Sequence, residues 1–169
     1  MERVDCGQPF GVIVDYAHSP DALEHLIRSA REIQEAPMSD RSNPSDRSDT
    51  GSRHRVIVVF GCGGNRDKEK RPIMGKVATE LADFVILTSD NPRDENPIDI
   101  INDIKAGITK DNYELAADRY TAIGRALSLA TNGDIVLIAG KGHEDYQIVG
   151  SERKHFDDEE TVKSLLGAQ

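Results

Sequence analysis

A run of five apolar residues, Val56-Ile57-Val58-Val59-Phe60, constrains the fold of this chain more than any other feature. Its first four residues are β-branched, which favours an extended strand. Because the run has no polar position, neither face of the strand can be left in water, and this is typical of a parallel sheet covered by helices on both sides. Parallel neighbours need long crossover connections, so strands and helices should alternate along the sequence.

The rest of the sequence shows that alternation. The predicted strands span residues 11–15, 56–60, 84–88, 113–115 (a short edge strand) and 134–139. The predicted helices begin near Ser19 and span 71–82, 97–107 and 119–130, and the tail adds a short strand at 154–156 and a helix at 158–166. We therefore expect an α/β fold in which a doubly wound, mostly parallel sheet is flanked by helices.

Two of the predicted helices carry apolar stripes that we expect to face the sheet. The stripes consist of Ala22, Leu23, Leu26, Ile27, Ala30 and Ile33 in one helix, and of Ile98, Ile101, Ile104 and Ile108 in the other. Ser19 is suited to cap the first helix, with Pro20 in its first turn.

Residues 37–54 break the alternation. This segment is rich in Ser, Asp and Arg and contains one large apolar residue, Met38. Such a composition does not offset the entropy lost on ordering, so we expect a disordered loop within a single domain spanning residues 1–169. A binding arm is the alternative interpretation.

Composition and charge exclude several classes of function. The net charge of −9 argues against a nucleic-acid partner. No apolar run approaches the roughly 20 residues needed to cross a membrane, and the first residues lack the apolar core of a signal peptide. Cys6 and Cys62 are isolated, so neither a disulfide framework nor a zinc site is indicated, and we expect a cytoplasmic protein. We interpret Cys62 as a small residue in a tight turn rather than as a nucleophile.

Polar clusters follow four of the predicted strands. These clusters are residues 15–21, 61–68, 90–93 and 140–144. In open α/β sheets, ligands bind beyond the carboxyl ends of the strands, so we expect the clusters to surround one cleft. Neither glycine-containing cluster forms a complete nucleotide motif: residues 61–66 fail G-x-G-x-x-G, and Gly140-Lys141 lacks the upstream glycine of a P-loop. These glycines either permit positive φ angles or contact a ligand.

The charged residues of the clusters indicate a zwitterionic ligand. Arg66 and Arg93 can each bind a carboxylate, whereas Asp90 and Glu144 can each bind an ammonium group. A surface ion pair is the alternative for either arginine.

Two histidines in the clusters have no assigned role. His18 and His143 can each orient a phosphate, move a proton or cap a helix. Asp15 lies close to His18 in the sequence and can join a group that handles phosphate and magnesium.

Four motifs in this order resemble the C-terminal domain of the Mur ligases, the ATP-dependent amide-forming enzymes of peptidoglycan synthesis. The motifs are V-D-Y-A-H-S-P-D-A-L, G-C-G-G-N-R-D-K-E-K-R-P, T-S-D-N-P-R-D-E-N-P and A-G-K-G-H-E-D-Y-Q. The resemblance implies a Rossmann-like domain, and its D-N-P-R motif implies addition of meso-diaminopimelate. By the same resemblance the diaminopimelate site consists of Arg66, Asp90, Asn91, Pro92, Arg93, Gly140 and Glu144, whereas Asp15 and His18 face ATP.

The resemblance also implies the reaction and its other participants. The amino acid is joined to UDP-N-acetylmuramoyl-L-alanyl-D-glutamate, with ATP and Mg²⁺ bound mainly by a central ATPase domain. That domain and an N-terminal UDP-binding domain are expected to be absent from this chain, which would supply no catalytic residue and no metal ligand and would be inactive in isolation. Two alternatives stay open: a stand-alone module that binds an amino acid or nucleotide, and a lysine-adding ligase, which Arg93 disfavours.

Overall fold

The fold was obtained as a computed structural model that describes residues 1–35 and 54–167. The loop predicted at 37–54 lies outside the described residues, apart from His54. Across the two described ranges, no helix combines the length and the apolar character that crossing a membrane requires.

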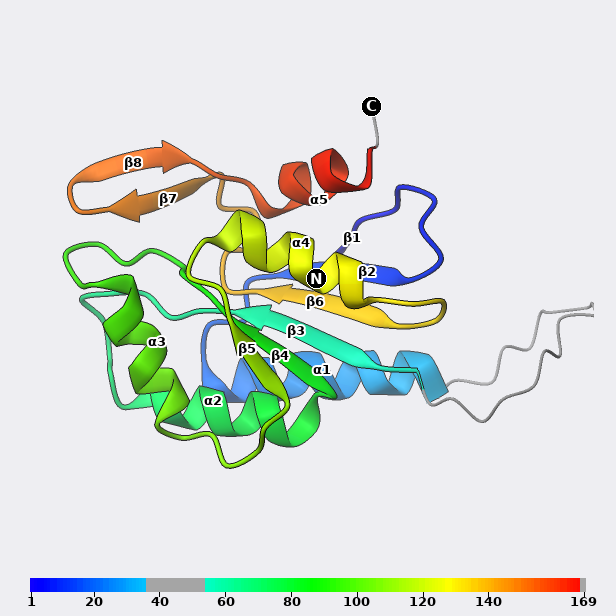
Figure 1. The fold of residues 1–169 in the computed structure, drawn as a ribbon, viewed down its shortest axis with the longest axis horizontal. Coiled ribbons are helices and arrows are strands. Elements are labelled where there is room, and N and C mark those ends of the chain that lie inside the picture. Colours follow the sequence, from blue (N-terminus) through cyan, green and yellow to red (C-terminus); the bar gives the residue numbers. More distant parts are fainter. Residues whose placement is uncertain (36–53, 168–169) are drawn as a thin grey trace, which may run out of the picture.

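A six-stranded sheet forms the centre of the molecule, with the strand order β1-β2-β6-β3-β4-β5 (Figure 1). Its strands are β1 (Glu2–Arg3), β2 (Gly11–Asp15), β3 (Val56–Phe60), β4 (Phe84–Leu87), β5 (Tyr113–Leu115) and β6 (Ile135–Ala139). All neighbours are parallel except β1, which runs antiparallel to β2 at one edge. The predicted fold class is confirmed.

In the described parts of the chain, five helices cover the sheet on both faces (Figure 1). They are α1 (Pro20–Glu35), α2 (Lys70–Leu81), α3 (Pro97–Lys105), α4 (Arg119–Leu129) and α5 (Asp158–Leu166). β3 is buried along its whole length: Val56, Val58 and Phe60 pack in the core layer with α1, α2 and α3, and Ile57 and Val59 pack in the layer with α4 and α5. The apolar run thus has two buried faces, as its composition predicts.

The end of the chain differs from the prediction. In place of a single strand at 154–156, an antiparallel hairpin forms from β7 (Tyr146–Val149) and β8 (Glu152–His155). This hairpin makes a separate two-stranded sheet, and its strands are half-buried or exposed. Without a buried face the segment lacks the apolar alternation by which strands are predicted. The two-residue strand β1 was also not predicted.

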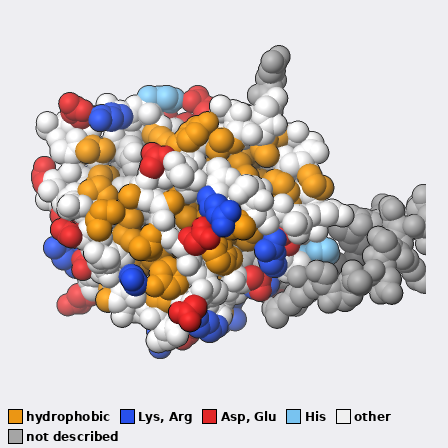
Figure 2. All heavy atoms as spheres, in the orientation of Figure 1, with side chains coloured by type: hydrophobic (Ala, Val, Ile, Leu, Met, Phe, Trp, Pro, Cys, Tyr) orange, Lys and Arg blue, Asp and Glu red, His pale blue; other side chains and the backbone are white. Residues whose placement is uncertain are grey.

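Two residues of the predicted apolar stripes do not face the sheet. Ile98 is 50% exposed, and its neighbour Ile100 is buried in its place with Ile101 and Ile104. Ile33 is 56% exposed near the end of α1, where it lines a surface hollow. Apolar and charged side chains are interspersed on the face drawn in Figure 2.

Side chains cap several of the helices that lead away from the sheet. Ser19 Oγ accepts the N–H of Ala22 at 3.3 Å, which confirms its predicted role. Asn96, Asp118 and Asp157 do the same at the starts of α3, α4 and α5. These caps satisfy N–H groups that have no partner within the helix.

Candidate functional site

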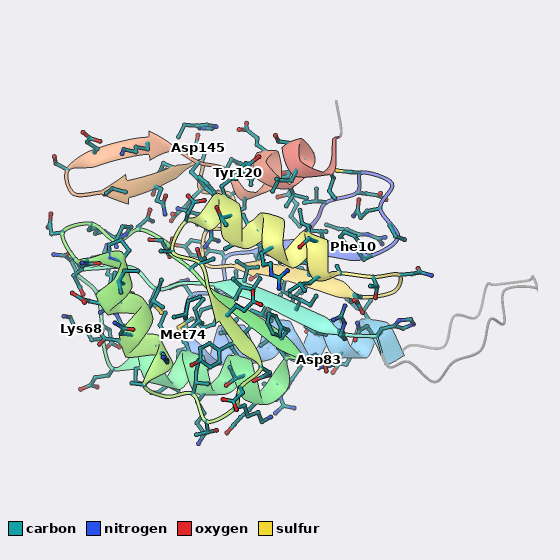
Figure 3. The ribbon with its side chains drawn as sticks, viewed as in Figure 1. Phe10, Lys68, Met74, Asp83, Tyr120 and Asp145 are labelled. Atoms are coloured by element: carbon teal, nitrogen blue, oxygen red, sulfur yellow. The ribbon has the colours of Figure 1, made fainter. Side chains whose placement is uncertain are left out.

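A cavity of about 470 Å³ lies at the carboxyl ends of β2, β3, β4 and β6. The labelled Lys68 and Asp145 mark this end of the sheet in Figure 3, whereas Phe10 and Asp83 mark the end where β2 and β4 begin. The cavity is lined by Tyr16, His18, Gly61, Cys62, Gly63, Arg66, Asp67, Lys70, Asp90, Asn91, Arg93, Gly140, Glu144 and Tyr146. The structure therefore brings together the four polar clusters that follow separate strands.

Most of the residues predicted for the site line this cavity. They are Arg66, Asp90, Asn91, Arg93, Gly140 and Glu144, joined by His18. Pro92 is buried beside the cavity without lining it. Asp15 also lies outside the lining: its carboxylate accepts the N–H of Ala17 at 2.8 Å and lies 2.8 Å from the amino group of Met1.

Arg93 has a left-handed backbone, with a φ angle of 52°. Its N–H donates to the carbonyl of Ile148 at 3.0 Å, and its carbonyl accepts the N–H of Gly150 at 2.7 Å. The β7–β8 hairpin therefore holds Arg93 in a backbone conformation that residues other than glycine rarely adopt. The guanidinium donates through Nη1 to the carbonyl of Gly64 at 2.8 Å. Its other nitrogens have no hydrogen-bond partner within the described residues, so they can donate to a ligand.

The glycines of the loop after β3 allow close contact with the loop after β4. A Cβ atom on Gly61 would lie 2.2 Å from the carbonyl oxygen of Thr88, and one on Gly64 would lie 1.8 Å from that of Pro92. Neither glycine has a positive φ angle, whereas Gly140 and Gly142 do. The first pair is thus explained by close approach of two backbones, and only the second by backbone conformation.

The buried side chain of Arg71 fixes the same two loops. It donates to both carboxylate oxygens of Glu95, at 2.9 and 3.0 Å, to Asp103 at 2.8 Å and to the carbonyl of Gly63 at 3.1 Å. Hydrogen bonds from Arg71, and secondarily from the backbone N–H of Asn65, lower the pKa of Glu95 from 4.5 to about 2. Nothing in the sequence marks Arg71 as buried, and its role was not predicted.

A second buried arginine connects two of the strand ends. Arg119 donates to the carbonyls of Ser89 and Ala139, at 3.3 and 3.1 Å. These carbonyls directly precede Asp90 and Gly140 in the sequence. Arg119 thereby helps to set the distance between two of the loops that line the cavity.

Below the cavity lies Lys141, which is completely buried. Its Nζ atom lies 3.5 Å from Asp90 Oδ1 and 3.7 Å from Glu144 Oε2. The sequence predicts that these carboxylates are available to a ligand ammonium group. The structure shows that a protein cation already shares them. The sequence does not predict this contact, because Gly140-Lys141 indicates only an incomplete P-loop.

Aromatic side chains lie at the rim of the cavity. The rings of Tyr16 and His18 are 4.7 Å apart, and those of Tyr16 and His143 are 6.3 Å apart. His18 Nδ1 is 2.9 Å from the carbonyl of Tyr16, and Lys70 donates to the carbonyl of His18 at 2.7 Å. Both histidines are exposed, so neither is a buried core residue.

The cavity is suited to binding a charged small molecule rather than to nucleophilic catalysis. Burial raises the pKa of Cys62 to about 12, so its thiol stays protonated and unreactive. Within the described ranges, no three His, Cys, Asp or Glu side chains gather in a way that would hold a metal ion. The lining places two arginines, one lysine and three carboxylates around one space; they are Arg66, Arg93, Lys70, Asp67, Asp90 and Glu144.

Comparison with known proteins decides the family. The family model described as "Mur ligase, glutamate ligase domain" matches residues 46–142. The chain belongs to this family. The resemblance seen in the four motifs is thus confirmed.

Two relatives of this Mur ligase domain share one name. A protein from Fusobacterium nucleatum is 50% identical over 164 residues, which cover 96% of this chain and 30% of the relative. One from Aquifex aeolicus is 48% identical over 159 residues, covering 94% of this chain and 29% of the relative. Both are named UDP-N-acetylmuramoyl-L-alanyl-D-glutamate--2,6-diaminopimelate ligase.

A solved structure with the same name is also similar to this domain. It superimposes with a TM-score of 0.82 at 39% identity, over 99% of this chain and 31% of that chain. This Mur ligase domain therefore spans about a third of the length of the proteins that it resembles.

Proposed function

We propose that this Mur ligase domain binds meso-diaminopimelate for an ATP-dependent ligase that joins it to UDP-N-acetylmuramoyl-L-alanyl-D-glutamate in peptidoglycan synthesis. The observation that carries the proposal is that Arg66, Arg93, Asp90 and Glu144 line one cavity. The names of the relatives support it.

The charges of the cavity match those of the amino acid. meso-Diaminopimelate carries two ammonium and two carboxylate groups, and lysine lacks one of the carboxylates. In the proposed complex Arg93 and Arg66 bind carboxylates, and Asp90 and Glu144 receive ammonium groups, with Asn91, Pro92 and Gly140 forming the surrounding wall. Lysine would leave a guanidinium without its partner, and a site that binds a polar group rejects analogues that lack it.

The domain contributes to the reaction by placing the attacking amine. Amide formation from a carboxylate requires activation, which ATP supplies as an acyl phosphate. Holding the amine at a fixed position beside the acyl phosphate makes the reaction between the two groups effectively unimolecular. Movement of this domain onto its ATPase partner would bring the two groups together and exclude water. No catalytic residue of this domain is required for that role.

ATP and Mg²⁺ are assigned mainly to a central domain beyond this chain. The described residues hold neither a P-loop nor a cluster of metal ligands, so they do not fit a magnesium site of their own. We assign His18, which lines the cavity, to face the nucleotide. Asp15 is also assigned to face the nucleotide, on the basis of the family resemblance. The proposal places the reaction in the cytoplasm.

A chimera tests this function directly. The chain replaces the corresponding third of the Fusobacterium nucleatum relative, and amide formation is measured with meso-diaminopimelate and with lysine. We expect activity with a strong preference for meso-diaminopimelate. Arg93→Ala should lower that preference at least about 30-fold, which corresponds to the roughly 2 kcal/mol lost when one partner of a buried charge pair is removed.

The matched control is Arg125→Ala, which removes an exposed arginine of α4 that pairs with Glu114 of β5; neither residue lines the cavity. It should leave the preference unchanged. Equal use of both amino acids by the wild-type chimera would refute the proposal. Calorimetric binding of meso-diaminopimelate to the chain without activity of the chimera would favour a stand-alone binding module instead.

A further inference from the structure

Lys141 is the one completely buried lysine among the described residues, and its Nζ atom contacts three side chains of the proposed site. Besides the carboxylates of Asp90 and Glu144, it donates to Asn91 Oδ1 at 3.2 Å. It also donates to the backbone carbonyl of Tyr146 at the start of β7. A single cation therefore connects the loop after β4, the loop after β6 and the hairpin.

These contacts determine the orientation of the Asn91 amide. Asn91 Oδ1 accepts from Lys141 and from the N–H of Ile148, the latter at 2.9 Å. With its oxygen held by two donors, the amide must present Nδ2 to Glu144, and it donates to Oε2 at 3.1 Å. Glu144 is thereby held in place by a side chain that Lys141 orients.

Lys141 also determines the charge of the pocket. Asp90 is 8% exposed, and its buried Oδ1 atom has no hydrogen-bond partner among the residues that the structure describes. Lys141 is its cation, at 3.5 Å. Burial lowers the pKa of Lys141, whereas the nearby carboxylates of Asp90 and Glu144 act in the opposite direction. In its protonated form, Lys141 offsets one of the three negative charges that line the cavity, those of Asp67, Asp90 and Glu144.

We propose that Lys141 is a positioning and specificity-determining residue, which organises Asn91 and Glu144 and adjusts the pocket to an amino acid without net charge. This inference rests on the proposed function. At neutral pH meso-diaminopimelate has a net charge of zero and lysine a net charge of +1. A buried cation therefore disfavours lysine, in addition to the selection made by Arg93, because it repels the extra positive charge.

The test compares Lys141→Met with the wild type in the chimera. The variant keeps the aliphatic length but leaves the buried carboxylate of Asp90 without its cation, so it should be less stable than the wild type, and circular dichroism checks that it folds. We expect the KM for meso-diaminopimelate to rise about tenfold or more, as the coupling of contacting charged residues predicts. The kcat should stay within about threefold, because ground-state and transition-state binding are lost equally.

The decisive quantity is the ratio of kcat/KM for meso-diaminopimelate to kcat/KM for lysine. Lys141→Met should lower this ratio about tenfold, since both amino acids lose the positioning of Asn91 and Glu144 but only lysine is also relieved of repulsion. A merely loosened pocket would lower kcat/KM for both amino acids by the same factor, and that result would overturn the inference. Lys110→Met, which removes an exposed lysine near the end of α2, is the control for the loss of one charge.

If circular dichroism shows that Lys141→Met does not fold, Lys141→Arg is measured in its place. It keeps the cation but enlarges the side chain, so the KM should rise while the preference over lysine is retained. A preference that falls as far as in Arg93→Ala would overturn the inference. A wild-type chimera with no preference for meso-diaminopimelate would instead refute the proposed function.

Discussion

The guanidinium of Arg119 donates to both carboxylate oxygens of Asp158, at 2.7 and 2.8 Å, and both side chains are completely buried. The pair joins the first residue of α4 to the first residue of α5 across 39 positions of sequence. Arg119 also donates to the carbonyls of Ser89 and Ala139, so the pair helps to hold two of the loops that line the cavity.

Breaking that pair should strongly destabilise the domain. Arg119→Met is expected to lower the free energy of unfolding by about 3–5 kcal/mol, because it leaves the Asp158 carboxylate buried without its partner. Urea denaturation measures the change. Removing both charges, in Arg119→Met with Asp158→Leu, should recover much of the loss. Arg125→Met, which breaks an exposed pair, should cost about 0–1 kcal/mol. A single Arg119 variant no less stable than this control would contradict the expectation.

Gly64→Ala should separate the two loops that Gly64 allows to touch. The new methyl group would lie 1.8 Å from the carbonyl oxygen of Pro92, so the backbone must move. We expect a loss of about 1–3 kcal/mol in stability, as for other overpacked sites. Calorimetry should show weaker binding of meso-diaminopimelate. Gly124→Ala in α4 is the matched control, since its Cβ would meet Leu165 of α5 at an ordinary 3.7 Å, and the substitution should stabilise α4 by about 0.5–1 kcal/mol. Equal effects of the two substitutions would show that steric contact at Gly64 is unimportant.

The stability of the domain should depend on pH through Glu95. The folded-state pKa of this carboxylate, about 2, lies below its ordinary value of 4.5. Its ionised form therefore stabilises the fold above the ordinary value, and this contribution is lost as the pH falls from 4.5 towards 2. Urea midpoints measured across this interval should fall more steeply for the wild type than for Glu95→Gln. Parallel curves for the two proteins would rule out the effect.

The two cysteines should differ in reactivity. The pKa of Cys62 is raised to about 12, and its side chain is buried, whereas Cys6 is partly exposed. Because the thiolate is the reactive species, a thiol reagent at neutral pH should label one cysteine of the folded chain and both after unfolding in guanidinium. Cys6→Ser should abolish labelling of the folded protein. Rapid labelling of Cys62 in that variant would contradict its assignment as an unreactive residue.

The sheet and the position of the cavity are predictable from sequence because their signals are local. β3 is a continuous apolar run, and the polar residues of the site directly follow their strands. Ser19 is likewise predictable as a helix cap, since its hydrogen bond spans three residues.

The buried charges that organise the site were not predictable. Arg71 meets Glu95 24 residues away, and Lys141 meets Asn91 50 residues away. Sequence neighbours do not indicate such pairs, because the partners become adjacent only when the sheet has formed. Local composition makes these residues look like ordinary surface charges.

The hairpin has a consequence for any exchange of parts between relatives. Ile148 and Gly150 hold the backbone of Arg93, yet both lie beyond residues 46–142, where the family match ends. A relative that received only the loop containing Arg93 would lack the backbone hydrogen bonds that hold Arg93 in its conformation. Transfer of the proposed amino-acid preference to a relative should therefore require residues 146–155 as well, although they are distant from residues 90–93 in the sequence.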